Sequence, residues 1–405
     1  MKKELNDLKK DLLEKKKPNW QDRKALKDML VKQKEMMENL EKKAIEQSKQ
    51  RMLDEKFNSF SEEIMQKQEM MQDMFEKLFD EEFKEKYEEM NKLMDEMNKS
   101  DMLEKLEEMN LDNDQLEKEL DRTLELFKQL ELEKKVEENI ERLEELINHQ
   151  DSLKEETQEK RSDSDELAGK QTEINKKAEA LDKELKQMED LNNALEEPQS
   201  IPDLEELSEE ARGDMAEAKE ELEKGRKVKA SDSQDDAKEK MQEMKEQLSS
   251  FQEEQANDQQ AENLEDMRQL LENIIDLSIG QEQVMEALTP VKGNDPKFAE
   301  LTKRQKNLVD DTQIVEDSLL ALSKRVPQIS KVINDEMSAV NFNMQKSLSY
   351  MSDQPPNRED QYKAMSVERQ QYAMTSLNNL ALLFDEIIQN MQKQMAPLMK
   401  GSGKC

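Results

Sequence analysis

The stretch LAGKQTEINKKAEALDKELKQMEDLNNAL, residues 167–195, contains the most regular heptad pattern of this chain. Its seam positions alternate in steps of four and three residues, which places them along one side of an α-helix. These positions are Leu167, Gln171, Ile174, Ala178, Leu181, Leu185, Met188, Asn192 and Leu195. Such a helix buries its seam against a second helix, so the sequence predicts a coiled coil. Asn192 falls at an a-type position, where a buried amide typically fixes the register of coiled-coil helices.

The composition extends this prediction to the whole chain of 405 residues. Hydrophobic residues make up 34% and aromatic residues 4%, whereas globular chains contain about 45–50% apolar residues, so too little apolar area is present for thick cores. Glycine and proline are scarce, while the helix-favouring residues Leu, Met, Glu, Lys and Gln are abundant. We therefore expect an all-α protein. Intrinsic disorder is the alternative, because low hydrophobicity and a net charge of −34 are also its signature.

Residues 1–195 are predicted to form a long-helix region of elongated antiparallel coiled-coil hairpins. Asn19 is the expected N-cap of the first long helix, with Asp22 in its first turn beside the positive end of the helix. The seam of that helix consists of Leu26, Leu30, Gln33, Met37, Leu40 and Ala44. Shorter seam fragments occupy residues 57–97. A later seam consists of Leu116, Leu120, Leu124, Phe127, Leu130, Val136, Ile140, Leu143 and Ile147.

Residues 196–260 are predicted to be an acidic hinge or linker that is partly disordered. Pro198 and Pro202 stop the preceding helix. Residues 223–240 have the composition of a linker, and residues 251–260 show no apolar period. Some labile helix is expected within this hinge.

Residues 261–398 are predicted to fold as an antiparallel four-helix bundle, followed by a flexible tail at 399–405. Turn sequences rich in Pro, Gly and Asn separate four amphipathic segments of about 25–30 residues, which as helices would be about 40 Å long. The second seam contains Phe298, Leu301, Gln305, Leu308, Thr312, Val315, Leu319 and Leu322. The third contains Ile333, Met337, Val340, Met344, Ser347 and Met351. The fourth contains Ala373, Leu377, Leu380, Phe384, Ile387, Met391, Gln394 and Leu398.

The fourth segment includes QQYAMTSLNNLALLF, residues 370–384, which has no charge in a chain that is 40% charged. It is too short and too polar to span a bilayer. Its core side is explained by the bundle, but the opposite side is also uncharged. That side consists of Tyr372, Ser376, Asn379 and Leu383. Either this helix is central and buried on several sides, or these four residues face a partner.

The charge distribution excludes some classes of function. Residues 261–405 contain 21 acidic and 16 basic residues, which leaves a net charge of −29 to residues 1–260. Such a surface repels phosphate backbones, so nucleic-acid binding is not expected. Cys405 is the single cysteine, so an internal disulfide is impossible. No window is long and apolar enough for a membrane span, and the Lys-rich start lacks the apolar core of a signal peptide, so the chain itself is expected to be soluble.

The sequence offers no convincing catalytic, metal or cofactor site. His149 is the one histidine and lies in a charged helical segment, where a solvated residue is more common than a general base. The C-terminal MKGSGKC lacks the spacing of a phosphate-binding loop, and the acidic pairs lack the glycine of a calcium loop. We therefore predict no enzyme activity, no catalytic residues, no metal site and no cofactor.

The 28 methionines and Trp20 allow several interpretations. Clusters such as Met70, Met71 and Met74, or Met391, Met395 and Met399, fit ordinary helix packing, an adaptable surface for varied partners, or Cu(I) binding by thioethers. Ordinary packing is favoured. Trp20 beside Lys15–Lys17 fits either packing at a helix start or an anchor at a lipid headgroup surface.

Five segments resemble a family of large bacterial membrane-anchored coiled-coil proteins of unknown function, and together they span most of residues 13–396. They are LEKKKPNWQDRKALKDML (13–30), ELDRTLELFKQLELEKKVEE (119–138), MRQLLENIIDLSIGQEQVM (267–285), QKNLVDDTQIVEDSLLALSKRVPQIS (305–330) and RQQYAMTSLNNLALLFDEIIQNMQKQM (369–395). The resemblance implies that this chain corresponds to the helical C-terminal region of such proteins. It further implies membrane attachment through segments outside this chain, and a location at the bacterial inner membrane facing the periplasm. No catalytic residues are defined for the family, so none are transferred.

The predicted function is that of a non-enzymatic structural or scaffolding protein of the bacterial cell envelope. Its expected partners are proteins, or further copies of the chain, that associate through helices. One alternative is an adaptor or holdase-like module that binds proteins through Met-rich faces. Another is a regulator of a partner enzyme.

Overall fold

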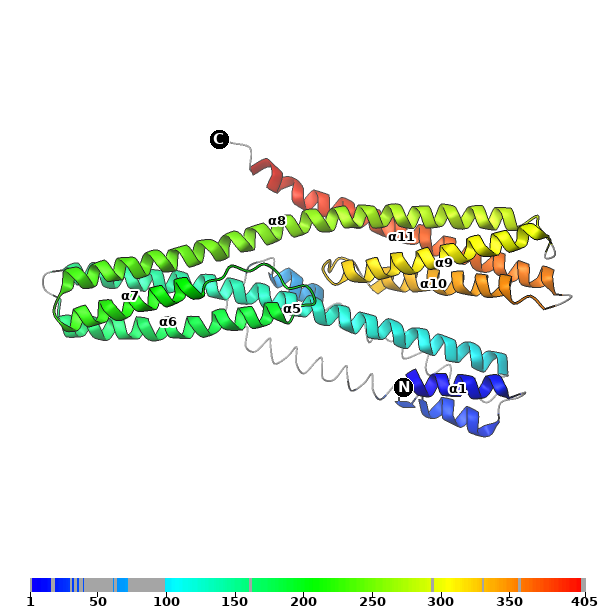
Figure 1. The fold of residues 1–405 in the computed structure, drawn as a ribbon, viewed down its shortest axis with the longest axis horizontal. Coiled ribbons are helices and arrows are strands. Elements are labelled where there is room, and N and C mark those ends of the chain that lie inside the picture. Colours follow the sequence, from blue (N-terminus) through cyan, green and yellow to red (C-terminus); the bar gives the residue numbers. More distant parts are fainter. Residues whose placement is uncertain are drawn as a thin grey trace. The chain divides into compact units, whose positions relative to one another are not determined.

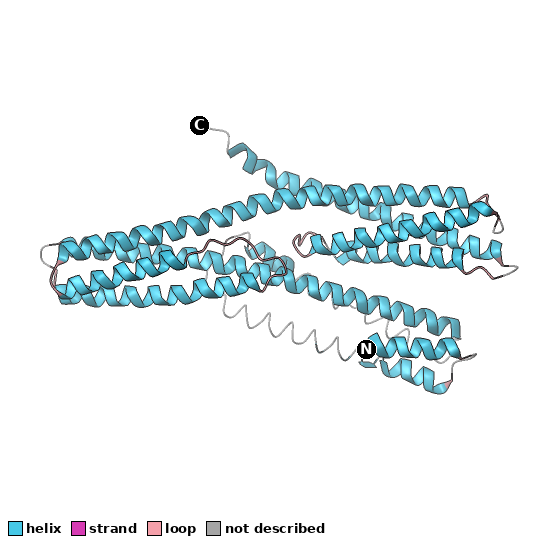
Figure 2. Cartoon of the chain, in the orientation of Figure 1, coloured by secondary structure: helices cyan, strands magenta, loops and turns pink. Residues whose placement is uncertain are grey.

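The computed structural model describes the following residues: 2–15, 19–29, 31, 32, 35, 39, 61, 64–71, 99–159, 162–292, 295–329, 331–355 and 358–401. Within them every regular element is a helix (Figures 1 and 2). The labelled helices are α1 (Lys2–Glu14), α5 (Lys99–Gln158), α6 (Ser164–Asn193), α7 (Glu205–Glu223), α8 (Lys227–Leu288), α9 (Pro296–Ser323), α10 (Lys331–Ser352) and α11 (Glu359–Gly401). Residues 20–29 and 64–71 are helical as well. The all-α prediction is thereby confirmed. None of these described helices combines the length and apolar character needed to cross a lipid bilayer.

The chain divides into two compact units, and both are assembled from separate parts of the sequence. Unit 1 contains residues 1–59, 69–124 and 262–405, and unit 2 contains residues 60–68 and 125–261. The helices α5 and α8 each contribute residues to both units. The boundary predicted at residue 195 therefore differs from the structure, because a heptad pattern does not mark the point at which a long helix changes its packing partners.

The core of unit 2 is built by α5, α6, α7 and α8, with α6 and α7 side by side (Figure 1). All nine seam positions of residues 167–195 are buried, as the sequence predicted. Asp163 caps α6 by accepting a 2.9 Å hydrogen bond from the backbone N–H of Asp165. In the earlier part of α5 one seam prediction is wrong, because Leu124 is 55% exposed while Leu126 and Leu132 are buried.

The predicted hinge at 196–260 is also wrong, because most of it forms α7 and the first part of α8. Both helices have steps of four and three, but small or polar residues occupy many of the buried positions. In α7 these positions are Ser208, Ala211, Met215, Ala218 and Leu222. In α8 they are Ala230, Gln234, Ala237, Met241, Met244 and Leu248. Alanine, serine and glutamine contribute little to a hydrophobic pattern. The sequence of residues 196–260 therefore predicts a linker, although these positions are packed.

Unit 1 contains the predicted four-helix bundle, formed by the second part of α8 with α9, α10 and α11. Its core contains Leu319, Val340, Leu380 and Phe384, each with an exposed fraction of 1% or less. The N-cap of α9 is Asp295, which accepts a 2.9 Å hydrogen bond from the N–H of Lys297. Helix α11 continues to Gly401, so the tail predicted at 399–405 is helical over its first part.

The N-terminal part of unit 1 confirms the predicted helix start at Asn19. The Asn19 side chain accepts from the N–H of Asp22 at 3.0 Å, and Asp22 accepts from the N–H of Asn19 at 2.8 Å. This reciprocal pair is a capping box. Leu12 and Leu26 are fully buried. The remaining seam positions predicted for this helix (Leu30, Gln33, Met37, Leu40 and Ala44) lie outside the described residues, as do most of those at 57–97.

The two four-helix cores follow one plan, because the buried positions of unit 2 recur in unit 1. Buried positions of α5 in unit 2 correspond to buried positions of α8 in unit 1 that lie 131 residues later, as in Gln150 and Gln281. Those of α6 recur 134 residues later in α9, as in Gln171 and Gln305. Those of α7 recur 129 residues later in α10, as in Met215 and Met344. Those of early α8 recur 136 residues later in α11, as in Gln234 and Gln370. Each core thus consists of a long helix, two shorter helices and a closing helix in the same order.

Candidate functional site

The most distinctive polar cluster of unit 2 is a layer of three fully buried glutamines, one each from α5, α6 and α8. The amides of Gln150 and Gln171 exchange two hydrogen bonds of 3.0 Å. Gln234 donates a third, also 3.0 Å, to Oε1 of Gln171. Nε2 of Gln171 donates a further 2.9 Å bond to Asn175. The layer joins three helices at one level of the core.

Unit 1 contains the same layer at the equivalent positions of α8, α9 and α11. Gln281 and Gln305 exchange hydrogen bonds of 3.0 and 2.7 Å, and Gln370 donates to Oε1 of Gln305 at 2.8 Å. All three residues are fully buried. In both units the Oε1 atom of the glutamine from the closing helix, Gln234 or Gln370, has no hydrogen-bond partner among the described residues.

The glutamine layers fix how the three helices are aligned along their length. A buried amide that loses its partner costs about 1–3 kcal/mol. Sliding one helix past another breaks the layer, so the three helices are held at one stagger. Amides do not titrate near neutral pH, so the layers offer no acid or base for catalysis. Sequence analysis placed Gln171 and Gln305 in seams but did not pair them with the other glutamines. A glutamine at the same level of several seams is the pattern that could have indicated this pairing.

A second polar cluster, in unit 1, is centred on Arg122 of α5. This side chain is fully buried, and its Nε donates to the carbonyl of Ser323 at 3.0 Å. NH2 donates to the carbonyl of Ile329, and NH1 lies 3.0 Å from the Glu119 carboxylate. Burial lowers the pKa of Arg122, whereas the Glu119 charge opposes that shift. Arg122 therefore binds the carbonyl of the last residue of α9 and that of Ile329 in the α9–α10 connection. Carbonyl groups at the end of a helix have no acceptor role within the helix and need such a donor.

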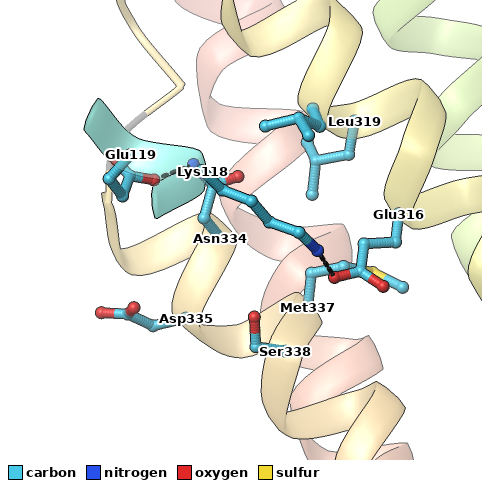
Figure 3. Close-up of a pocket in the computed structure, with 9 residues that line it drawn as sticks. Lys118, Glu119, Glu316, Leu319, Asn334, Asp335, Met337 and Ser338 are labelled. Atoms are coloured by element: carbon cyan, nitrogen blue, oxygen red, sulfur yellow. Dashed lines mark hydrogen bonds and ion pairs between the residues drawn. The ribbon is translucent and has the colours of Figure 1, made fainter. Parts of the chain in front are cut away.

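Beside this cluster, α5 and the α9–α10 pair enclose a small cavity (Figure 3). Lys118 reaches across it to the carboxylate of Glu316, which also accepts from Asn341. Glu119 accepts from Asn334. The cavity measures about 20 Å³. That volume holds roughly one water molecule, so this cavity does not admit an organic substrate.

In unit 2, two neighbouring residues of α5 bind the backbone of the connection between α6 and α7. Lys128 donates to the carbonyl of Ala194 at 2.8 Å, and Glu125 accepts from the N–H of Glu196 at 2.7 Å. Asn192 is buried, as predicted, but both of its hydrogen bonds go to the backbone of Gln199. It thus fixes the end of α6 locally, whereas the prediction gave it a register role between helices.

The four candidate partner-facing residues do not share one face in the structure. Tyr372 and Asn379 are exposed, whereas Ser376 and Leu383 are partly buried and Leu383 packs against the bundle core. Tyr372 donates to Glu368 at 3.1 Å, and Asn379 donates to Glu336 of α10 at 3.0 Å.

The remaining candidates from the sequence are placed as follows. His149 is exposed, with Nδ1 3.5 Å from Nζ of Lys177. Among the described residues no group of His, Cys, Asp or Glu is arranged to hold a metal ion. Met71 and Met391 are buried, which fits their packing interpretation. Trp20 is 72% exposed, with Nζ of Lys24 5.3 Å from its ring centre.

A comparison with known proteins finds no family model, no curated protein and no solved structure that matches this chain.

Proposed function

We propose that this chain is a non-enzymatic scaffold whose helical bundles present and separate other components. The observation that carries the proposal is the repeated four-helix plan, in which each core is mainly apolar and contains a layer of three buried glutamines. The buried polar layers fix helix stagger, which is a property that a spacer needs.

The proposed place of action is the bacterial cell envelope, at the inner membrane and facing the periplasm. The support is the family resemblance of the five segments quoted above, with attachment through segments outside this chain. A tag placed at an exposed position should become accessible to protease when the outer membrane is permeabilised. Protection of the tag until the inner membrane is lysed would contradict this placement.

The scaffolding proposal is tested against its alternatives with the purified full chain. A scaffold should show slow hydrogen exchange in both units and should leave the aggregation of an unfolded client protein unchanged. Suppression of client aggregation at stoichiometric amounts would favour the holdase-like adaptor instead. Recovery of one stoichiometric enzyme in a pull-down, with its activity changed by the chain, would favour the regulator.

A further inference from the structure

The exposed side of α11 carries a second line of residues in coiled-coil spacing, opposite the line that packs in the bundle. Four residues form it, spaced by three, four and three positions, and all are exposed. They are Tyr372, Thr375, Asn379 and Leu382, and we call them the outer seam. Leu382 is 70% exposed and Tyr372 is 49% exposed. The flanking residues Gln371, Ser376, Asn378 and Leu383 are also uncharged.

Unit 2 provides an internal control for this surface. The first part of α8 occupies there the position that α11 occupies in unit 1, 136 residues earlier in the sequence. The counterparts of the outer seam are Asp236, Glu239, Glu243 and Glu246, and all four are exposed. The closing helix of this bundle therefore tolerates four acidic residues on its outer side. In α11, Asn379 donates to Glu336 of α10 at 3.0 Å, so packing within the bundle accounts for that amide. It does not explain why Tyr372, Thr375 and Leu382 are uncharged.

The uncharged surface continues onto the neighbouring helix. Ser278 of α8 donates to Asn378 of α11 at 2.9 Å, which places the two helices in contact at this level. Ile275 and Ile279 of α8 are 42% and 47% exposed. Their counterparts in unit 2 are Glu144 and Asn148, both polar. In unit 1, both α8 and α11 therefore have a less polar outer surface than the corresponding helices of unit 2.

We propose that the outer seam binds the outer seam of a second copy of this chain, with the two α11 helices antiparallel. The chain has a net charge of −34, so two copies repel each other over most of their surface and approach most easily through an uncharged face. An uncharged face is also complementary to another uncharged face, because a charged partner would lose hydration there without gaining a counter-charge.

The spacing of the outer seam is self-complementary, as a two-fold symmetric contact requires. Tyr372 and Leu382 lie five residues on either side of Leu377, and Thr375 and Asn379 lie two residues on either side. A two-fold axis at the level of Leu377 therefore sets each Tyr372 against the second copy's Leu382. It sets each Thr375 against the second copy's Asn379. The aromatic and aliphatic groups meet at both ends, and groups able to hydrogen-bond meet in the middle.

The ends of the outer seam determine how the contact responds to salt. Glu368 and Glu386 lie nine residues on either side of Leu377, so the same axis brings each Glu368 near the second copy's Glu386. Like charges at the ends, together with the net charge of the whole chain, oppose association. Screening by salt should therefore strengthen the dimer, in contrast to a contact held by ion pairs.

The first test is the oligomeric state of the full chain, measured by sedimentation velocity over a range of protein and salt concentrations. We expect a monomer–dimer equilibrium that Leu382→Glu weakens by at least tenfold. The matched control is Ile314→Glu, which adds the same charge at a residue of α9 that is 65% exposed and outside the seam. Circular dichroism checks that both variants remain folded. A chain that is monomeric at every concentration overturns the proposal, and so does a dimer that both variants weaken equally.

The second test addresses the orientation, in full-length chains in which Cys405→Ser removes the native thiol. One chain carries Thr375→Cys and another carries Asn379→Cys. The antiparallel contact predicts that a mixture of the two forms disulfide-linked dimers faster than either chain alone. Equal cross-linking of each chain by itself would indicate a parallel contact and overturn the proposed arrangement. Absence of cross-linking in the mixture would overturn it as well.

Discussion

The two four-helix cores bury equivalent positions, but they differ in the surface contacts between the first helix and the closing helix. In unit 2 the long helix α5 is joined to α8 by ion pairs. These pairs are Lys154–Asp235, Lys238–Asp151 and Lys245–Glu144. The corresponding positions in unit 1 are Met285 with Gln371, Glu282 with Met374, and Ile275 with Ala381, so none of the three pairs recurs.

The buried positions and the surface positions therefore vary independently of each other in the two units, although the helix order is the same. The core residues and the glutamine layer recur in both units, whereas the outer residues differ in charge from position to position. Exposed ion pairs contribute only about 0–1 kcal/mol each, so exchanging them for uncharged residues leaves the fold intact. The buried positions are therefore the ones that should respond strongly to substitution.

The largest effect is expected for Arg122→Ala in unit 1. Removing the guanidinium leaves the carbonyls of Ser323 and Ile329 without this donor and leaves the buried Glu119 without its counter-ion, which should cost about 3–5 kcal/mol. The matched change in unit 2 is Lys128→Ala. The Lys128 side chain is 27% exposed, so water can replace it and the expected loss is about 1 kcal/mol or less. Urea unfolding with hydrogen exchange resolved by unit measures both, and equal losses would contradict the distinction.

The next largest effect concerns the glutamine layers. Gln171→Leu in unit 2 and Gln305→Leu in unit 1 each remove the amide that binds both other glutamines, so each should cost its own unit about 2–3 kcal/mol. Changing all three glutamines of one layer to Leu should recover most of that loss, because no polar group is then left unpaired. If the single and triple variants are equally unstable, the layer does not act as a paired unit.

The fold class and the bundle could be predicted because apolar residues mark most of their seams. The seam from Ile333 to Met351 of α10 is buried at every position that the spacing selected. The packing of residues 205–260 could not be predicted in this way, since positions such as Ala230, Gln234 and Ala237 bury little apolar surface each. The partners of the glutamines and of Arg122 also remained hidden, because contacts between distant helices depend on a stagger that one seam does not reveal.

A smaller effect is expected at the end of α6. Asn192→Ala removes two hydrogen bonds to the backbone of Gln199, of 2.9 and 2.8 Å, and should destabilise unit 2 by about 1–2 kcal/mol. The neighbouring Asn193 is exposed, so Asn193→Ala is the control and should change stability little. A change of molecular mass in Asn192→Leu, measured by light scattering, would show instead that this position controls association of helices.

The smallest effect on stability is expected for a cluster of glutamates around Glu141 of α5, whose counterparts in α8 are less acidic. Glu141 is close to four glutamates, Glu137, Glu138, Glu144 and Glu145. The counterparts of these four in unit 1 are Arg268, Gln269, Ile275 and Asp276. Partial desolvation of the carboxylate, and then the charges of the neighbouring glutamates, raise the pKa of the exposed Glu141 above its ordinary value of 4.5.

A raised pKa means that the folded state binds more protons than the unfolded state, so ionised Glu141 destabilises unit 2 at neutral pH. This destabilisation is relieved as the pH falls through the raised pKa, and the relief is complete below the ordinary value of 4.5. Glu141→Gln should therefore stabilise unit 2 at pH 7, and the gain should disappear in acid. The control is Glu272→Gln in α8, which has fewer acidic neighbours and should give a smaller gain at pH 7. The urea midpoints of both variants, measured across the pH range, test this prediction. A gain in stability from Glu141→Gln that persists in acid would show that charge repulsion is not its cause.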